Sequence, residues 1–127
     1  MFKLLTSQKI FLASIISKFL VFFFGSEKKI VKRNNINYKI DLNEGVDLGV
    51  FLNIKLEKKI LSLTKLLDKN KKLNLVDIGA NFGSVTLPLA KIFKKSKIFS
   101  IEPTYYAYEK LITNVNLNPD LKKRIKT

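Results

Sequence analysis

The sequence predicts an α/β fold built on a parallel sheet. Two short apolar runs have the composition of buried strands, and each is followed by a segment in which apolar residues recur at helical spacing. This order implies parallel strands joined by crossover helices. A carboxylate lies at or just after the end of each run, which is where such sheets bind ligands. The predicted elements are a strand at 73–78, a helix at 84–94, a strand at 98–101 and a helix at 104–116.

The first 37 residues are predicted to form an apolar helix and a basic linker. The run 10–24 is apolar except for two serines and Lys18, and it is shorter than the roughly 20 residues of a membrane span. We favour an amphipathic helix that packs on its own domain or on a membrane surface. An uncleaved membrane anchor and a signal peptide stay open as alternatives, although Lys18 interrupts the apolar region that a signal requires. Residues 25–37 are polar and basic, which is typical of a solvated connector and would also suit an anionic membrane.

The second predicted unit is residues 38–127. Alternation over 38–42 predicts a short strand, and 43–45 predict a turn. Leucines and isoleucines at steps of three and four predict one amphipathic helix over 50–68. The sheet described above follows.

Composition limits the chemistry of the chain. It has neither Cys nor His, which excludes disulfides, thiolate nucleophiles and imidazole bases. The net charge of +14 permits an anionic partner, but 22 of the 24 basic residues are Lys, with Arg33 and Arg124 as the two exceptions. Specific reading of nucleic acid favours Arg, so we consider a nucleic-acid partner unlikely. Together with many Ile and Asn residues, the Lys excess is typical of an AT-rich genome.

The turn after the first strand, Asp77-Ile-Gly-Ala-Asn-Phe-Gly83, is suited to a nucleoside ligand. Gly79 allows backbone conformations that other residues resist and lets a ligand approach the main chain. Gly83 allows close packing of helix and strand. Asp77 can face a cationic amine, and Glu102, 25 residues later, can accept hydrogen bonds from both hydroxyls of a ribose. These features describe S-adenosyl-L-methionine, a nucleoside with an amino-acid tail and no phosphate.

Two other glycine motifs fit the turn less well. The dinucleotide fingerprint G-x-G-x-x-G would need a glycine at the position of Asn81, and the spacing from Gly79 to Gly83 differs. A P-loop would need Lys and then Ser or Thr directly after its last glycine, and Ser84 stands there instead.

At these residues the sequence resembles the FkbM family of class I methyltransferases, which have a Rossmann-like fold. The turn with Asn81 in place of a glycine and the Glu102-Pro103 pair are typical of that family. The matching segments are 76–83, 101–104, 107–114 and 116–119. A weaker similarity covers 38–67, where the family has a strand, a turn and a helix with an acidic residue at the position of Glu57.

The resemblance implies the cofactor S-adenosyl-L-methionine and a role for each matching residue. Glu102 would bind the ribose. Glu57 would face the pocket, or else be a solvated charge on a helix. Asn114 and Asn118 are expected to cap a helix end rather than to touch a ligand. The residues around the methionine end would be Asp77, Gly79, Ala80, Asn81 and Gly83, and those near the adenine would be Pro103, Thr104 and Tyr105.

The family usually methylates hydroxyl groups of sugars or other small metabolites, which implies a small-molecule or glycan acceptor. The later strands and substrate-facing loops of such a domain are not predicted in this chain. We therefore expect an incomplete class I methyltransferase fold that binds its cofactor poorly alone and catalyses little. The alternatives are a nucleic-acid methyltransferase and an inactive membrane-associated remnant. The expected location is the cytoplasm, with residues 1–33 able to bring the chain to the inner face of the membrane.

Overall fold

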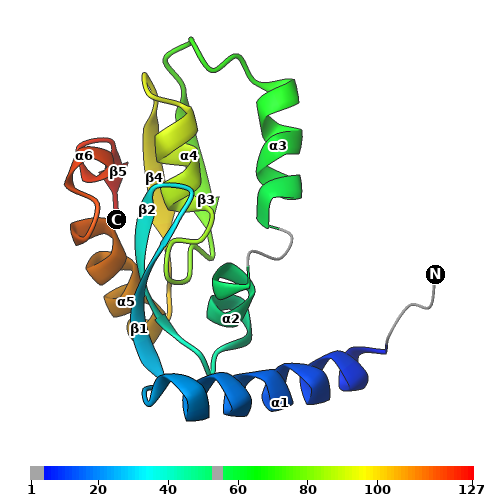
Figure 1. Cartoon of the computed structure of the whole chain (residues 1–127). Coiled ribbons are helices and arrows are strands. Elements are labelled where there is room, and N and C mark those ends of the chain that lie inside the picture. The colour runs from blue at the N-terminus through cyan, green and yellow to red at the C-terminus, as the bar shows by residue number, and fades with distance from the viewer. Residues whose placement is uncertain (1–4, 53–55) are drawn as a thin grey trace.

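The computed structural model of the protein describes residues 5–52 and 56–127 (Figure 1). Its strands form two sheets: an antiparallel hairpin of β1 and β2, and a parallel sheet of β3, β4 and β5. The predicted order of strand, helix, strand and helix is confirmed as β3, α4, β4 and α5. In chain order the elements are α1 (Thr6–Phe24), β1 (Lys28–Arg33), β2 (Ile36–Asp41), α2 (Gly45–Phe51), α3 (Leu56–Leu66), β3 (Asn74–Ile78), α4 (Thr86–Ile92), β4 (Lys97–Ile101), α5 (Tyr105–Asn116), α6 (Pro119–Lys122) and β5 (Ile125–Lys126).

Helix α1 confirms the helical prediction for 10–24. Its first turn is closed by the Gln8 side chain, which accepts a hydrogen bond from the Leu5 amide at 2.9 Å. It ends at Gly25, whose φ of 64° is left-handed and whose amide donates to the carbonyl of Val21. Helix α1 crosses one end of the hairpin and extends away from the rest of the chain (Figure 1).

The hairpin corrects the prediction of a linker over 25–37. Strands β1 and β2 pair along their whole length, from Lys28 opposite Asp41 to Arg33 opposite Ile36. The two residues between them, Asn34 and Asn35, have φ of 48° and 56°. Positive φ at both central residues is the backbone of the tight turn that joins antiparallel strands, and Asn tolerates it well. The charged residues of β1 therefore belong to a strand and not to a connector.

The parallel sheet has the order β3-β4-β5, so β4 is its central strand. In the β3–β4 pair, Asp77 lies opposite Ser100 and Ile78 opposite Ile101. Strand β5, with two residues, adds a third parallel strand that the sequence did not predict. This arrangement brings the carboxyl ends of β3 and β4 side by side.

One predicted helix is two helices in the structure. The helix expected over 50–68 is replaced by α2, which ends at Phe51, and by α3, which begins at Leu56. The predicted positions 53–55 lie outside the described residues. Arg33 donates two hydrogen bonds to the Phe51 carbonyl, at 3.1 and 2.6 Å, and so satisfies an acceptor at the end of α2.

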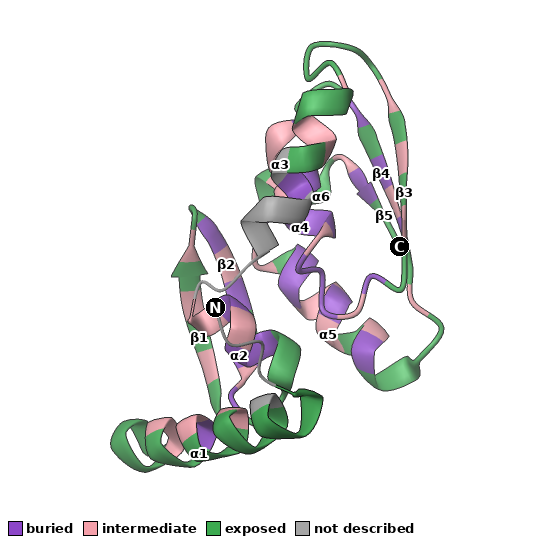
Figure 2. Cartoon of the chain, turned by 90° about the vertical axis from the view of Figure 1, so that its right-hand side faces the viewer, coloured by how far each residue is buried: buried purple, intermediate pink, exposed green. Residues whose placement is uncertain are grey.

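The core lies between β2, the parallel sheet and helices α4 and α5, where the buried residues gather in Figure 2. Phe82, Phe93 and Leu111 are completely buried there. The Tyr38 ring meets the Phe82 ring edge-on with 6.0 Å between centroids, which joins the hairpin to the glycine turn. The hairpin and the parallel sheet therefore share one core.

Two buried asparagines attach α5 to β2: Asn114, within the helix, and Asn118, just after its end. Asn114 accepts a hydrogen bond from the Lys39 amide at 2.6 Å and donates to the carbonyls of Lys39 and Phe82. Asn118 accepts from the Asn37 amide at 2.9 Å and donates to the Asn37 carbonyl at 2.7 Å. Asn118 also donates to the Asn114 carbonyl, as a cap would. The capping prediction is therefore correct in part for Asn118 and wrong for Asn114, which lies within α5. We call Asn114 and Asn118 the asparagine clasp.

Candidate functional site

The glycine turn after β3 is bonded to the end of β4. The amides of Gly79 and Ala80 both donate to the Ile101 carbonyl, at 2.9 and 3.1 Å. Gly79 has φ of 75° and Asn81 has φ of 49°, both in the left-handed region. A Cβ atom built on Gly79 would meet no atom within 4 Å, so the main chain is open to a ligand at this point. The Ala80 side chain is buried and faces the core instead.

Gly83 has a packing role, and the close contact it allows is between the turn and α5. Its φ is 93°, and a Cβ atom there would lie 3.0 Å from Cδ1 of Leu111. The turn can therefore lie directly against α5 only because this position has no side chain.

The Glu102 carboxylate joins the two loops at the carboxyl ends of β3 and β4. Its Oε2 accepts a hydrogen bond from the Asn81 amide at 2.8 Å, and its Oε1 accepts one from the Thr104 amide at 2.9 Å. These bonds, the Thr104 bond foremost, lower the pKa of the Glu102 carboxyl. Each carboxylate oxygen accepts one of these bonds and keeps further lone-pair capacity for a ligand.

The Asp77 carboxylate is oriented by a buried hydroxyl pair that the sequence analysis missed. Thr86 donates to Oδ2 of Asp77 at 2.6 Å, and the hydroxyls of Thr86 and Ser100 lie 3.0 Å apart. Because a threonine hydroxyl has one proton, Ser100 is the donor in that second bond. Thr86 and Ser100 are both buried. No sequence motif marks them, because ordinary core positions also hold Thr and Ser.

The three residues expected near the adenine follow Glu102 and are exposed. Pro103 and Thr104 lie in the loop after β4, and Tyr105 begins α5 with 79% of its surface exposed. The structure thus brings Asp77, the glycine turn, Glu102 and these three residues to one edge of the sheet. The side chain of Glu57 lies outside the described residues. The two side chains of the asparagine clasp bond to the backbone of β2.

A buried ion pair lies on the hairpin side of the turn. The Nζ atom of Lys110 is 2.6 Å from Oδ2 of Asp47, which is 1% exposed and also accepts from the Asp41 amide at 2.8 Å. Burial raises the pKa of the Asp47 carboxyl, and the Lys110 bond opposes that rise. Lys110 also lies 5.3 Å from the centroid of the Phe82 ring. The ion pair therefore joins α5 to α2 above the turn, a role that sequence reasoning missed.

The pocket at this side is separate from the site at the strand ends. It has a volume of about 150 Å³ and opens between the hairpin and α5. Asp77, Gly79 and Glu102 are not among its lining residues, so it is not the predicted cofactor site. It is lined by Lys28, Lys39, Ile40, Asp41, Tyr106, Glu109, Lys110 and Thr113.

No family model matches the sequence, and no curated protein matches it. The structure is similar to a transferase from Pyrococcus horikoshii, with a TM-score of 0.57 and 21% identity over 88% of this chain and 45% of that one. It is equally similar to P. horikoshii TYW2, solved in complex with MeSAdo, with a TM-score of 0.57 and 21% identity over 87% of this chain and 45% of that one. M. jannaschii TYW2, solved in complex with AdoMet, gives a TM-score of 0.55 and 23% identity over 80% of this chain and 42% of that one.

These similarities confirm the predicted fold, a Rossmann-like class I methyltransferase fold that is present here in part. The chain spans less than half the length of the three structures it matches. The narrower resemblance to the FkbM family stays a prediction.

Proposed function

We propose that this chain is the cofactor-binding part of an S-adenosyl-L-methionine-dependent methyltransferase of FkbM type. The observation that supports this most is the Glu102 carboxylate, which is fixed by the amides of Asn81 and Thr104 beside an open glycine turn. In complexes with MeSAdo and AdoMet, proteins of similar fold bind this kind of nucleoside.

The described residues fit the two ends of that cofactor. The remaining lone pairs of Glu102 would accept hydrogen bonds from the ribose hydroxyls. Asp77, oriented by Thr86, would attract the amino group of the methionine end. The absence of a side chain at Gly79 lets the ligand lie against the main chain. Ala80, Asn81 and Gly83 would shape the turn, and Pro103, Thr104 and Tyr105 would border the adenine.

When bound, the cofactor supplies an electrophilic methyl group on a sulfonium. We propose that the acceptor is a hydroxyl of a sugar or small metabolite. With the cofactor bound, transfer would break the carbon–sulfur bond with its electron pair left on sulfur, form a carbon–oxygen bond and release the hydroxyl proton to solvent. The contribution of this chain to that step is to position the methyl donor and to hold its charged groups.

The test is a titration of the isotope-labelled 127-residue chain with S-adenosylhomocysteine, followed by NMR. Because the chain covers part of the fold, we expect binding in the millimolar range. Amide signals of 79–81, 102, 104 and 105 should shift. Glu102→Gln should weaken binding about tenfold or more, since a hydrogen bond to a charged group contributes roughly 1.5–3 kcal/mol. The matched control is Glu109→Gln, which changes an exposed carboxylate of α5.

Three results would count against the proposal. The first two are no shift at millimolar ligand while the chain is folded, and equal weakening of binding by both variants. Shifts confined to the pocket beside Lys110 would also contradict it, because they would place the ligand away from the strand ends.

Methylation of nucleic acid is the second candidate, and the net charge of +14 is the observation that favours it. Both arginines, however, are engaged within the fold. Arg33 donates to the Phe51 carbonyl, and Arg124 donates to the Ala90 carbonyl at 3.1 and 3.0 Å. The side chains best suited to phosphate are thus occupied. RNA binding that survives high salt would favour this candidate over the first.

A further inference from the structure

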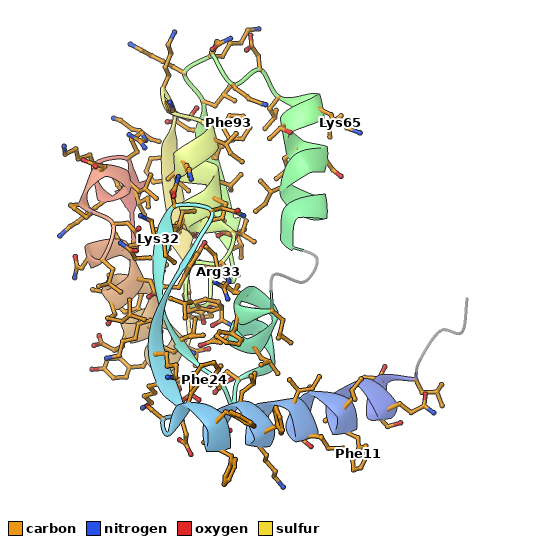
Figure 3. All side chains as sticks on the ribbon, in the orientation of Figure 1. Phe11, Phe24, Lys32, Arg33, Lys65 and Phe93 are labelled. Atoms are coloured by element: carbon orange, nitrogen blue, oxygen red, sulfur yellow. The ribbon has the colours of Figure 1, made fainter. Side chains whose placement is uncertain are left out.

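Helix α1 exposes a continuous apolar stripe. Its members recur at spacings of one, three and four residues, which places them along one side of a helix. Each is at least 48% exposed, and Phe22 is 84% exposed. Figure 3 shows Phe11 pointing away from the rest of the molecule. We call these residues the α1 stripe: Phe11, Leu12, Ile15, Phe19, Phe22 and Phe23.

The opposite side of α1 is attached to the domain. Ser17 is 5% exposed, and its hydroxyl donates to Oδ1 of Asn43 at 2.9 Å. Ile16, Leu20 and Val21 are half-buried and pack against the core. The helix therefore contacts the domain on one side between residues 13 and 21, and its other side is free along its length.

Cationic residues flank the α1 stripe. Lys18 is exposed on the helix itself. Beyond its C-terminal end, Lys29 lies 4.4 Å from the centroid of the Phe24 ring and donates to the Phe24 carbonyl. Lys28 is exposed at the start of β1. Apolar aromatic residues beside lysines match a surface with an acyl interior and anionic headgroups.

We propose that α1 lies in the plane of an anionic membrane surface, with the α1 stripe inserted below the headgroups and the α/β domain above them. The nineteen residues of α1 extend about 28 Å, which is close to the roughly 30 Å of a bilayer interior. By length and composition α1 could therefore also span a membrane. Spanning would withdraw Ser17 from Asn43 and expose the half-buried side of α1. The attachment of that side therefore favours the in-plane orientation.

Flotation with vesicles tests whether the partner of the α1 stripe is an anionic membrane. The intact chain should bind vesicles of phosphatidylcholine and phosphatidylglycerol, and more weakly those of phosphatidylcholine alone. Phe19→Ser should reduce binding about tenfold, because it removes one large inserted side chain. Leu66→Ser is the matched control, since Leu66 is 80% exposed on α3 and lies outside the α1 stripe. Circular dichroism should show that both variants are folded. Equal binding by Phe19→Ser and the parent chain would overturn the proposal.

The depth of single tryptophans tests the orientation, because the chain has no Trp of its own. Brominated lipids should quench Ile15→Trp and Phe23→Trp at the same depth if α1 lies in the plane. A deep signal at 15 with a shallow one at 23 would indicate a spanning helix and contradict the in-plane orientation. A chain that ignores vesicles but forms a dimer, which Phe19→Ser dissociates, would show that a second copy covers the α1 stripe.

Discussion

The Glu102 carboxylate and the Asn81 amide are joined by a hydrogen bond of 2.8 Å between the loops that follow two neighbouring strands. Asn81 has a left-handed backbone, and the bond to Glu102 helps to hold it there. The carboxylate is thus part of the turn as well as a candidate ligand for a ribose. This double role makes its ionisation relevant to folding.

We expect the stabilising effect of Glu102 to depend on pH. Its pKa is lowered below the ordinary value of 4.5 in the folded chain, chiefly by the Thr104 and Asn81 amides. The folded state therefore binds a proton less readily than the unfolded state, and the contribution is present above pH 4.5 and is lost as the pH falls through the lowered value.

Urea unfolding of the parent chain and of Glu102→Gln, from pH 7 down to pH 3, measures this effect. Glu102→Gln should be less stable than the parent chain at pH 7. The difference between their free energies of unfolding should become smaller in acid. A difference that stays constant over that range would show that the charge of Glu102 has no part in holding the turn.

Loss of Asn114 should destabilise the fold strongly. Asn114→Ala would leave the Lys39 amide and the Phe82 carbonyl without their side-chain partner, and each buried group left unpaired costs about 1–3 kcal/mol. We expect a loss of about 2–4 kcal/mol in chemical unfolding. Asn116→Ala, at an exposed position of the same helix, should change stability by less than about 0.5 kcal/mol. Equal effects would mean that helix propensity and not the asparagine clasp decides the outcome.

Two glycines should respond in opposite directions to replacement by alanine. Gly83→Ala should destabilise by about 1–3 kcal/mol, because its φ is 93° and the new Cβ would lie 3.0 Å from Leu111. Gly49→Ala lies within α2 and would meet nothing within 4 Å, so it should stabilise by about 0.5–1 kcal/mol. Thermal unfolding monitored by circular dichroism compares the two. A neutral Gly83→Ala would refute the packing role assigned to this position.

Removing the cation from the buried ion pair should destabilise the chain in a pH-dependent way. Lys110→Met would leave Asp47 buried without its cation, at a cost of about 3 kcal/mol at pH 7. Burial already raises the pKa of Asp47 above 3.8, so the folded state binds this proton more tightly. The free energy of unfolding therefore falls as the pH rises through that raised value. The difference in this free energy between the parent chain and Lys110→Met should become smaller in acid.

Lys123→Met is the matched control for that experiment, because it breaks an exposed pair with Asp120 at 3.5 Å. Exposed pairs contribute about 0–1 kcal/mol. A comparable loss from both variants at pH 7 would contradict the distinction between the two pairs.

The sequence predicts those elements of the fold in which apolar residues have a spacing typical of a strand or of a helix. Strands β3 and β4 follow from their apolar runs, and the meeting of their carboxyl ends follows from the order of strand, helix, strand and helix. The sequence does not predict β1, because its four basic residues are also typical of a solvated linker. The signal that could have found it is Asn34-Asn35, two residues that tolerate positive φ between alternating segments.

Other features depend on contacts far apart in the chain and leave no local pattern. The bonds from Asn114 to Lys39 and from Lys110 to Asp47 link residues 75 and 63 positions apart. Thr86 and Ser100 orient Asp77 from two different elements. The end of α2 is satisfied by Arg33 from the hairpin. Sequence periodicity reports which side of an element is apolar, but it does not report which partner that side meets.

The asparagine clasp has a consequence for self-association. Strand β2 has the amides and carbonyls of Asn37 and Lys39 along its outer edge. The side chains of Asn114 and Asn118 already bond to these groups. Its partner β1 carries Lys28, Lys29 and Lys32, charges that discourage edge-to-edge pairing with another chain. Within 5–52 and 56–127, β3 pairs with β4 alone. Strand β5, the other edge of this sheet, has two residues, so a foreign strand would add mainly beside β3. A lysine placed on the β3 edge should therefore slow aggregation of the chain.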